Sequence, residues 1–557
     1  MISHQHVPTV AQHHRAFLLM FFLISILFLT NIGAYKQFSR AESAFSLGAR
    51  MMLETNEFLL PHPPQGLPLN KPPLQYWLIG TSYRFLDIGY GASRVPSALC
   101  ALGVIMLVYY LGLRLYGKLT ALTAAAMLAS SYLFLSFARL AMPDILLTLC
   151  ISVALSCWTL VLTDQTARPR TLALIGYGAV ACGFLAKGPV AVALAVTPIS
   201  IELLIAHDFV HLKRLRPFSG LIVFLLIAAP YFFLVYARYG VEPLRTFFIN
   251  ENLQRFAGTG IYQSRMPALL YFTAFFGGFA PWSPLTAFVA CLDFKHRSVT
   301  HMQRRALRML YIWVIFPIIF FSASRFRLDY YLLPCMPAAA LITARIASRY
   351  ERSSSWSKPV MSIFALTLAV LLLIMASFTI RPVGLLFPDL SLRHLPFCVA
   401  AISFMPVLFF VWRGRVNYIL LALIFAFFAI MLSILLIFPP NFSQSQPASL
   451  LASSVPTEAN VYTSSEASEW AADLALHLPA SQPVKTIIEG SDNSKLRAIL
   501  QNDPRAVALV YEQEYSMLNR TGMQLNVLAQ GYTYKGFRLT PKLLFHPVRE
   551  RLLLVTK

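Results

Sequence analysis

The stretch DILLTLCISVALSCWTLVLT, residues 144–163, carries one charged side chain, and that charge stands at its first position. An α-helix of about 20 apolar residues is long enough to cross the hydrocarbon core of a bilayer. Such a helix also satisfies its own backbone hydrogen bonds, which an irregular chain in lipid cannot do. The stretch therefore predicts a membrane-spanning helix.

The composition of the whole chain agrees with this prediction. Of its 557 residues, 57% are hydrophobic and only 13% are charged, which is typical of a protein that crosses the membrane many times. The net charge is +22, but the basic residues stand between apolar runs. This pattern indicates positive loops and a phosphate-bearing ligand, and it argues against a nucleic-acid partner.

Similar apolar runs recur on both sides of residues 144–163, and they predict a polytopic α-helical membrane protein. The first run is too long for a signal peptide and has no small-residue cleavage site after it, so we interpret it as an anchor. We expect about thirteen membrane-spanning helices, near residues 16–35, 92–113, 119–138, 144–163, 171–187, 189–206, 217–238, 266–290, 309–323, 328–347, 359–380, 395–412 and 416–438.

The loops between these runs alternate in character, which predicts the orientation of the chain. Short loops rich in lysine and arginine remain on the cytoplasmic side of membranes. One set of loops has this composition, with Arg114 and Lys118, Arg168 and Arg170, Lys213, Arg214 and Arg216, Lys295 to Arg308, Arg345 to Lys358, and Arg413 and Arg415. The other set, which includes 36–91 and 239–265, is therefore expected outside.

The composition changes sharply after residue 438. The stretch PPNFSQSQPASLLASSVP, residues 439–456, is typical of a linker. Short pieces that alternate between strand-like and helix-like patterns follow it, and they predict a small α/β domain. We thus expect a transmembrane domain over residues 1–438 and an outer, periplasmic α/β domain over residues 439–557.

Polar residues of unusual kinds gather in the loops expected outside. Charges at membrane depth are energetically costly, and they mark functional sites by default. Lys71 is distinctive because two prolines follow it and exclude a regular helix there. The candidate site comprises the acids Glu42 and Asp144, the phosphate-binding candidates Lys71, Arg139, Lys187, Arg325, Arg327, Tyr330 and Tyr331, and the further cavity residues Glu251 and Arg255.

Each of these residues also has a purely structural interpretation. The lysines and arginines can anchor the chain at the lipid headgroups, Asp144 can cap a helix, and the tyrosines can belong to an aromatic belt. Glu251 can simply pair with Arg255 four residues later on a helix. The functional interpretation rests on their co-location in one set of loops.

A cavity with cations and acids at the membrane surface suits a sugar donor carried on a lipid phosphate. Lysine or arginine would bind the phosphate and stabilise it as it leaves. A carboxylate would deprotonate an acceptor hydroxyl or stabilise positive charge at the anomeric carbon. The sequence contains no glycine-rich phosphate loop, so no soluble nucleotide is required.

Several motifs resemble those of membrane glycosyltransferases with the C-type fold. They are KPPLQYW at 71–77, ARLAMPDILLT at 138–148, LAKGP at 185–189, NENLQRF at 250–256, Pro281-Trp282 and SRFRLDYYLLP at 324–334. The nearest groups are the bacterial aminoarabinose transferases acting on lipid A and the protein O-mannosyltransferases. The resemblance implies an inner-membrane enzyme that transfers a hexose or pentose from a polyprenyl-phosphate carrier to lipid A, another glycan or a protein.

The resemblance also assigns roles to residues. It implies that Lys71 contacts the carrier phosphate, with Lys187, Arg325 or a tyrosine of the pair as helpers, and that Asp144 matches the second acidic position. The first acidic motif departs from the family form, which resembles Asp-Glu-x-Arg-Tyr, because this chain has AESAF at 41–45. Glu42 is then the acid that remains in this motif.

Two other classes of function stay open at this point. A transporter or flippase is one, although such proteins place broken helices and polar sites at mid-membrane. A relative without activity that only binds polyprenyl phosphate is the other. The sequence names neither the sugar nor the acceptor, no cofactor is evident in it, and the involvement of a divalent metal stays open.

Overall fold

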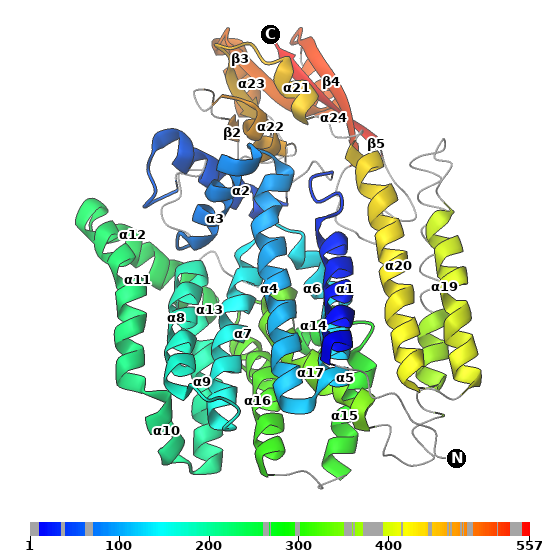
Figure 1. Cartoon of the computed structure of the whole chain (residues 1–557). Coiled ribbons are helices and arrows are strands. Elements are labelled where there is room, and N and C mark those ends of the chain that lie inside the picture. The colour runs from blue at the N-terminus through cyan, green and yellow to red at the C-terminus, as the bar shows by residue number, and fades with distance from the viewer. Residues whose placement is uncertain are drawn as a thin grey trace.

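The described part of the chain is a bundle of helices with a small mixed sheet at one end (Figure 1). The structure is a computed structural model, and it describes residues 10–34, 39–61, 71–259, 267, 269–295, 301–349, 359, 362–370, 394–413, 416–443, 448–464, 467, 470–479, 482, 484–486, 494–520, 522–534 and 549–557.

The first part of the bundle contains α1 (Val10–Leu29), α2 (Arg40–Thr55), α3 (Leu74–Leu86), α4 (Tyr90–Tyr116), α5 (Lys118–Ala129), α6 (Tyr132–Ala138), α7 (Pro143–Leu162), α8 (Pro169–Lys187) and α9 (Pro189–Ala206). The second part contains α10 (Phe209–Leu215), α11 (Pro217–Tyr239), α12 (Glu242–Arg245), the π-helix η1 (Thr246–Gln254), α13 (Arg255–Ala257), α14 (Leu270–Gly278), α15 (Ser283–Lys295), α16 (His301–Ala323), the 3-10 helix η2 (Asp329–Cys335), α17 (Met336–Arg349), α19 (Leu395–Trp412) and α20 (Val416–Ser443).

The described residues confirm a multi-pass helical membrane protein. Eight of their helices are long and apolar enough to cross a membrane, and the number becomes ten if each of two bent pairs counts as one span. Three of the predicted runs are not in this count. The apolar part of α1 is short (Arg15–Leu29), the run 328–347 starts as the 3-10 helix η2, and the run 359–380 lies partly outside the described residues.

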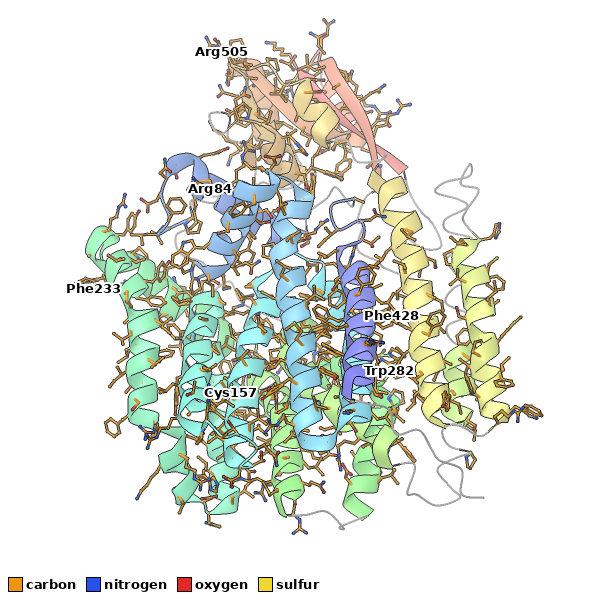
Figure 2. The ribbon with its side chains drawn as sticks, viewed as in Figure 1. Arg84, Cys157, Phe233, Trp282, Phe428 and Arg505 are labelled. Carbon is orange, nitrogen blue, oxygen red and sulfur yellow. The ribbon has the colours of Figure 1, made fainter. Side chains whose placement is uncertain are left out.

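Residues 144–163 form the centre of the bundle, as α7. In this helix 89% of the apolar window is buried inside the protein, against 22% in the span that includes α11. A helix that is apolar on every side belongs in a core, whereas α11 turns its apolar side chains outward, as a lipid-facing helix does. Figure 2 shows Phe233 on α11, where 69% of the residue is exposed, and Trp282 in the interior, where the residue is fully buried.

The two bent pairs interrupt runs that the sequence presents as continuous. The pair α5 and α6 bends by 67° at Ser130 and Ser131, and the pair α14 and α15 bends by 106° around Pro281. At the first bend the Ser130 hydroxyl donates to the carbonyl of Ala126 and so competes with the backbone ladder. At the second, proline lacks the amide hydrogen that the helix needs.

The C-terminal segment contains a five-stranded sheet in the order β2-β1-β3-β5-β4. The strand β1 lies between β2 and β3 and pairs in parallel with both, and β5 pairs antiparallel with both β3 and β4. Apolar side chains of β3 and β5 alternate between two buried clusters, one on each face of the sheet. The elements are α21 (Ala448–Ser453), β1 (Asn460–Thr463), α22 (Ala471–His477), β2 (Val484–Thr486), α23 (Ser494–Asn502), β3 (Ala506–Tyr511), α24 (Glu512–Arg520), β4 (Asn526–Tyr534) and β5 (Arg549–Thr556).

This segment rests on α2, at the end of the bundle where α3 also lies (Figure 1). The Arg50 guanidinium donates to the carbonyl of Ala475 at 2.9 Å and to that of Leu478 at 2.7 Å, at the C-terminal end of α22. A cation at the last carbonyls of a helix interacts favourably with the helix dipole. The contact therefore fixes α2 between the bundle below and the sheet above.

Candidate functional site

The predicted site residues meet because neighbouring helices run in opposite directions. Asp144 stands in the first turn of α7 and Lys187 is the last residue of α8, so the antiparallel pair brings the two side chains to the same end. The chain returns to this end after α11, where η1 carries Glu251, and again after α16, where η2 carries Tyr331. Residues far apart in sequence thus converge beneath α2 and α3.

One carboxylate joins two cations in this cluster. Oε2 of Glu251 lies 3.2 Å from Nζ of Lys71 and 3.3 Å from Nη1 of Arg255. The Arg255 guanidinium also stacks on the ring of Phe326, with 4.4 Å to its centroid. The pairing of Glu251 with Arg255, four residues later, is the purely structural interpretation of this carboxylate. The same carboxylate also binds Lys71, which lies 180 residues away in the sequence.

A second ion pair lies beside the first. Nζ of Lys187 lies 2.5 Å from Oδ1 of Asp144 and 4.8 Å from the ring centroid of Tyr331. The ring of Tyr330 is 5.7 Å from the same ammonium. Asp144 does not cap α7, because the N-cap position is Met142 and no side chain caps the helix.

Glycine allows the Lys187 end of α8 to meet η1. Gly188 has a φ of +80°, a conformation that side chains with a Cβ rarely adopt. A Cβ at this position would also lie 2.4 Å from the ring of Phe247 in η1. The LAKGP motif therefore allows close contact between the turn after Lys187 and the π-helix that carries Glu251.

Lys71 is held on a short non-helical segment, as its prolines predicted. The chain turns through Pro72 and Pro73, and α3 begins at Leu74. Burial lowers the pKa of Lys71 to about 8; the nearby cations Arg255 and Lys187 lower it too, and Glu251 opposes this shift. At neutral pH the lysine is therefore charged in a site of several cations.

Glu42 is placed in a different set of contacts. It is 1% exposed, and its Oε1 accepts hydrogen bonds from Nε of Arg94 and from the backbone N–H of Ala141, both at 3.0 Å. Its Oε2 accepts from the N–H of Ser39 and completes a capping box at the start of α2. Among the described residues no hydrogen bond or ion pair joins Glu42 to Asp144 or Lys71.

Three other predicted cations lie outside the two ion pairs. The Arg139 guanidinium donates to the carbonyls of Leu27, Phe28 and Thr30 at the end of α1. Burial lowers the pKa of Arg139 to about 10, and Arg94 adds to this. Arg327 donates to the carbonyl of Ser322, and the exposed Arg325 packs its side chain against Gly258.

Sequence reasoning missed Arg94, which is 2% exposed and forms the buried ion pair with Glu42. A signal was present, because Arg94 is a charge near the start of an apolar run, and such charges seek partners. The partner itself, 52 residues earlier, could not be read from local sequence.

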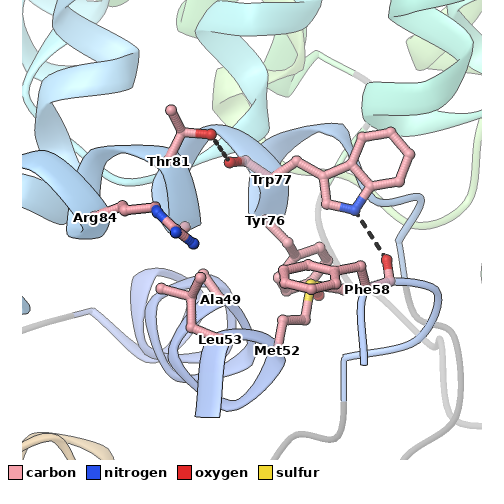
Figure 3. A pocket seen from close by; sticks show the side chains of 9 residues that line it. Ala49, Met52, Leu53, Phe58, Tyr76, Trp77, Thr81 and Arg84 are labelled. Carbon is pink, nitrogen blue, oxygen red and sulfur yellow. Dashed lines mark hydrogen bonds between the residues drawn. The ribbon is translucent and has the colours of Figure 1, made fainter. Parts of the chain in front are cut away.

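A pocket of about 380 Å³ opens between α2 and α3 (Figure 3). The described residues that line it are mostly apolar, and the Arg84 guanidinium is the one charged group among them. Tyr76 belongs to this lining and also lies near Glu251, so the pocket and the cluster share a side chain. The indole of Trp77 forms another wall and donates to the carbonyl of Phe58 at 2.9 Å. The other lining residues are Ala49, Met52, Leu53, Gly80 and Thr81.

Comparisons with known proteins match this architecture. Residues 70–233 match the family model described as dolichyl-phosphate-mannose-protein mannosyltransferase, a range that includes Lys71, Asp144 and Lys187. An uncharacterized protein of Aquifex aeolicus is 29% identical over 394 residues, which cover 70% of this chain and 75% of that protein.

An undecaprenyl phosphate-alpha-4-amino-4-deoxy-L-arabinose arabinosyl transferase of Pectobacterium atrosepticum is also similar. It is 28% identical over 347 residues, which are 60% of this chain and 61% of the transferase, so the chain aligns with less than two thirds of that relative.

A solved structure extends the likeness over nearly the whole chain. The crystal structure of ArnT from Cupriavidus metallidurans bound to undecaprenyl phosphate superimposes with a TM-score of 0.74 at 18% identity, covering 97% of this chain and 98% of that one. The resemblance to membrane glycosyltransferases of the C-type fold is therefore confirmed at the level of the fold.

Proposed function

We propose that the protein is a glycosyltransferase that moves a sugar from a polyprenyl-phosphate carrier to an acceptor. The observation that carries the proposal is the cluster in which Lys71, Lys187 and Arg255 surround the carboxylates of Asp144 and Glu251. Among the described residues this cluster pairs three cations with two carboxylates, and a phosphate is an anion that such a set of cations can bind and stabilise. The likeness to transferases that use undecaprenyl phosphate donors supports the same chemistry.

The residues divide into three roles in this proposal. Lys71 and Arg255 bind the carrier phosphate, with Tyr331 beside Arg255. Asp144, oriented by Lys187, is the base at the acceptor. Glu42 is a positioning residue, because its hydrogen bond to the N–H of Ala141 holds the segment that leads into α7.

The transfer step follows from these roles. The acceptor oxygen forms a bond to the anomeric carbon, and the bond from that carbon to the phosphate oxygen breaks. The acceptor proton passes to the carboxylate of Asp144, and the electron pair stays on the departing polyprenyl phosphate. The phosphate gains negative charge as it leaves, and Lys71 and Arg255 stabilise that charge.

The reaction would take place on the periplasmic side of the membrane. The short basic loops lie at the end of the bundle opposite α2, α3 and the sheet, and such loops remain in the cytoplasm. The cluster would then face the periplasm of a bacterial inner membrane, with residues 439–557 as a periplasmic α/β domain over the transmembrane domain of residues 1–438.

For the acceptor, the pocket between α2 and α3 favours a lipid over a soluble glycan or a protein. Its apolar lining suits an acyl chain, and the Arg84 guanidinium suits an anionic headgroup. Exposed apolar side chains continue from the pocket along α3, with Phe85 80% and Leu86 55% exposed. Lipid A is an acceptor with both properties.

The test is sugar transfer by the purified protein in nanodiscs. One donor would be undecaprenyl phosphate carrying the pentose 4-amino-4-deoxy-L-arabinose, and the other would be polyprenyl phosphate carrying the hexose mannose. Each donor would be tested with lipid A, a glycan or a peptide as acceptor. Lys71→Ala should lose most of the transfer, while Lys118→Ala, at the start of α5 at the opposite end of the bundle, should retain it. Binding of undecaprenyl phosphate without transfer to any acceptor would favour a silent binder, and movement of intact donor across the bilayer would favour a flippase.

A further inference from the structure

The carboxylate of Glu251 occupies a position that a phosphate oxygen would need. Its Oε2 alone accepts from both Lys71 and Arg255, at 3.2 and 3.3 Å. A phosphate that takes over these same N–H groups must displace the carboxylate. A phosphate that uses the other N–H groups of the two cations would stand close to the carboxylate, and the two anions would repel each other.

The surroundings allow the carboxylate to leave while the cations stay. Lys71 is followed by Pro72 and Pro73, which restrict its backbone. Arg255 has a second contact, on the ring of Phe326, that does not involve Glu251. Glu251 itself lies in the π-helix η1, and π-helical turns are less regular than α-helical ones and are frequent at functional sites.

We propose that Glu251 is an exchangeable counter-ion, which holds Lys71 and Arg255 in place and gives both up when a carrier phosphate enters. This inference rests on the proposed assignment of those two cations to the phosphate. Its consequence for turnover is that Glu251 competes with the spent carrier phosphate and so promotes its release. Glu251 is therefore a positioning residue whose effect falls on the affinity for phosphate.

The test is the affinity for undecaprenyl phosphate at pH 7. Glu251→Gln should bind it about tenfold more tightly, because a competing charge is removed, and added undecaprenyl phosphate should inhibit transfer at correspondingly lower concentrations. A purely structural role for Glu251 would instead weaken binding. Glu251→Asp, which keeps the charge on a shorter side chain, should lie between the two and provides a second variant if the glutamine protein folds poorly.

The matched control is Glu242→Gln, which removes an exposed carboxylate from the neighbouring helix α12, where Glu242 pairs with Arg245. It should leave the affinity unchanged. Equal or weaker binding by both Glu251 variants, with Lys71→Ala still losing affinity, would overturn the counter-ion and leave the proposed function in place. Unchanged affinity in Lys71→Ala would instead remove the phosphate assignment itself.

Discussion

Lys71 is the residue through which pH should act on carrier binding. Its pKa is lowered to about 8, chiefly by burial, and an anion binds the protonated form. The contribution of Lys71 to the affinity for undecaprenyl phosphate should therefore be full well below pH 8, half lost near pH 8, and should fall above it by up to about tenfold per pH unit. Titration of the dissociation constant between pH 6.5 and pH 10 measures this.

Arginine at the same position separates charge from geometry. Lys71→Arg should bind more weakly at pH 7, since the fork of the guanidinium replaces a compact ammonium, but its affinity should persist to pH 10 because arginine stays charged. Parallel loss of affinity in both proteins above pH 8 would show that another group titrates.

The two predicted acids should respond differently to neutralisation. Glu42→Gln removes the carboxylate from the buried ion pair with Arg94, and breaking such a pair costs about 3–5 kcal/mol. The variant should unfold at lower temperature, and Glu42→Gln combined with Arg94→Gln should recover part of the loss. Thermal unfolding in detergent measures both.

Asp144→Asn tests the acid in the cluster. Turnover should fall by about 10²-fold or more, as for removal of a general base, while affinity for undecaprenyl phosphate changes far less. A loss of affinity that matches the loss of turnover would contradict a role in the transfer step.

At the residue scale, sequence identified what was chemically unusual but not its partner. Lys71, Asp144 and Lys187 stood out because charges beside apolar runs are costly, and the structure brings them together with Glu251. Glu42 looked similar in sequence. Its pairing with Arg94 depends on where α2 lies against α4, which no local pattern encodes.

At the scale of elements, substitution of alanine for glycine should have opposite effects on stability at two positions, one in α2 and one in α3. A Cβ on Gly48 would lie 2.6 Å from the Tyr76 ring, whereas one on Gly80 would make an ordinary contact of 3.8 Å with Leu53. Gly80→Ala should stabilise the protein by up to about 1 kcal/mol through helix propensity.

Gly48→Ala should destabilise the protein, because the buried Tyr76 must move, and with it the start of α3 near Lys71. The melting temperatures of the two variants in one detergent provide the comparison. Equal stabilisation by both would mean that α2 and α3 separate freely.

Sequence predicted the apolar elements better than their shapes. The period and length of an apolar run indicate a helix in lipid. A bend in that helix needs only one residue that disturbs the backbone hydrogen bonds, such as Ser130, whose hydroxyl bonds to a backbone carbonyl, or Pro281, which has no backbone N–H. The start of the run 328–347 likewise becomes 3-10 at Asp329 to Cys335, where Pro334 removes a backbone donor.

At the scale of the whole molecule, the orientation of the chain remains the largest prediction. A cysteine at the exposed Ser516 of α24 should react with an impermeant maleimide in intact spheroplasts, in a background that lacks native cysteines. A cysteine at the exposed Ala167, between α7 and α8, should react only after lysis. The reverse pattern would place the cluster in the cytoplasm.

The alternating path of the helices has a consequence for how such a chain can change. The chain crosses the membrane twice between Asp144 and Lys187, and twice again between Lys187 and the Glu251 segment. The side of the membrane on which each cluster residue lies therefore depends on whether the number of spans before it is odd or even. One additional span inserted between α8 and η1 would carry Arg255 to the opposite side from Lys71, and a duplicated pair would not. Between Lys71 and Tyr331, spans can therefore be gained or lost only in even numbers if the cluster is to stay together.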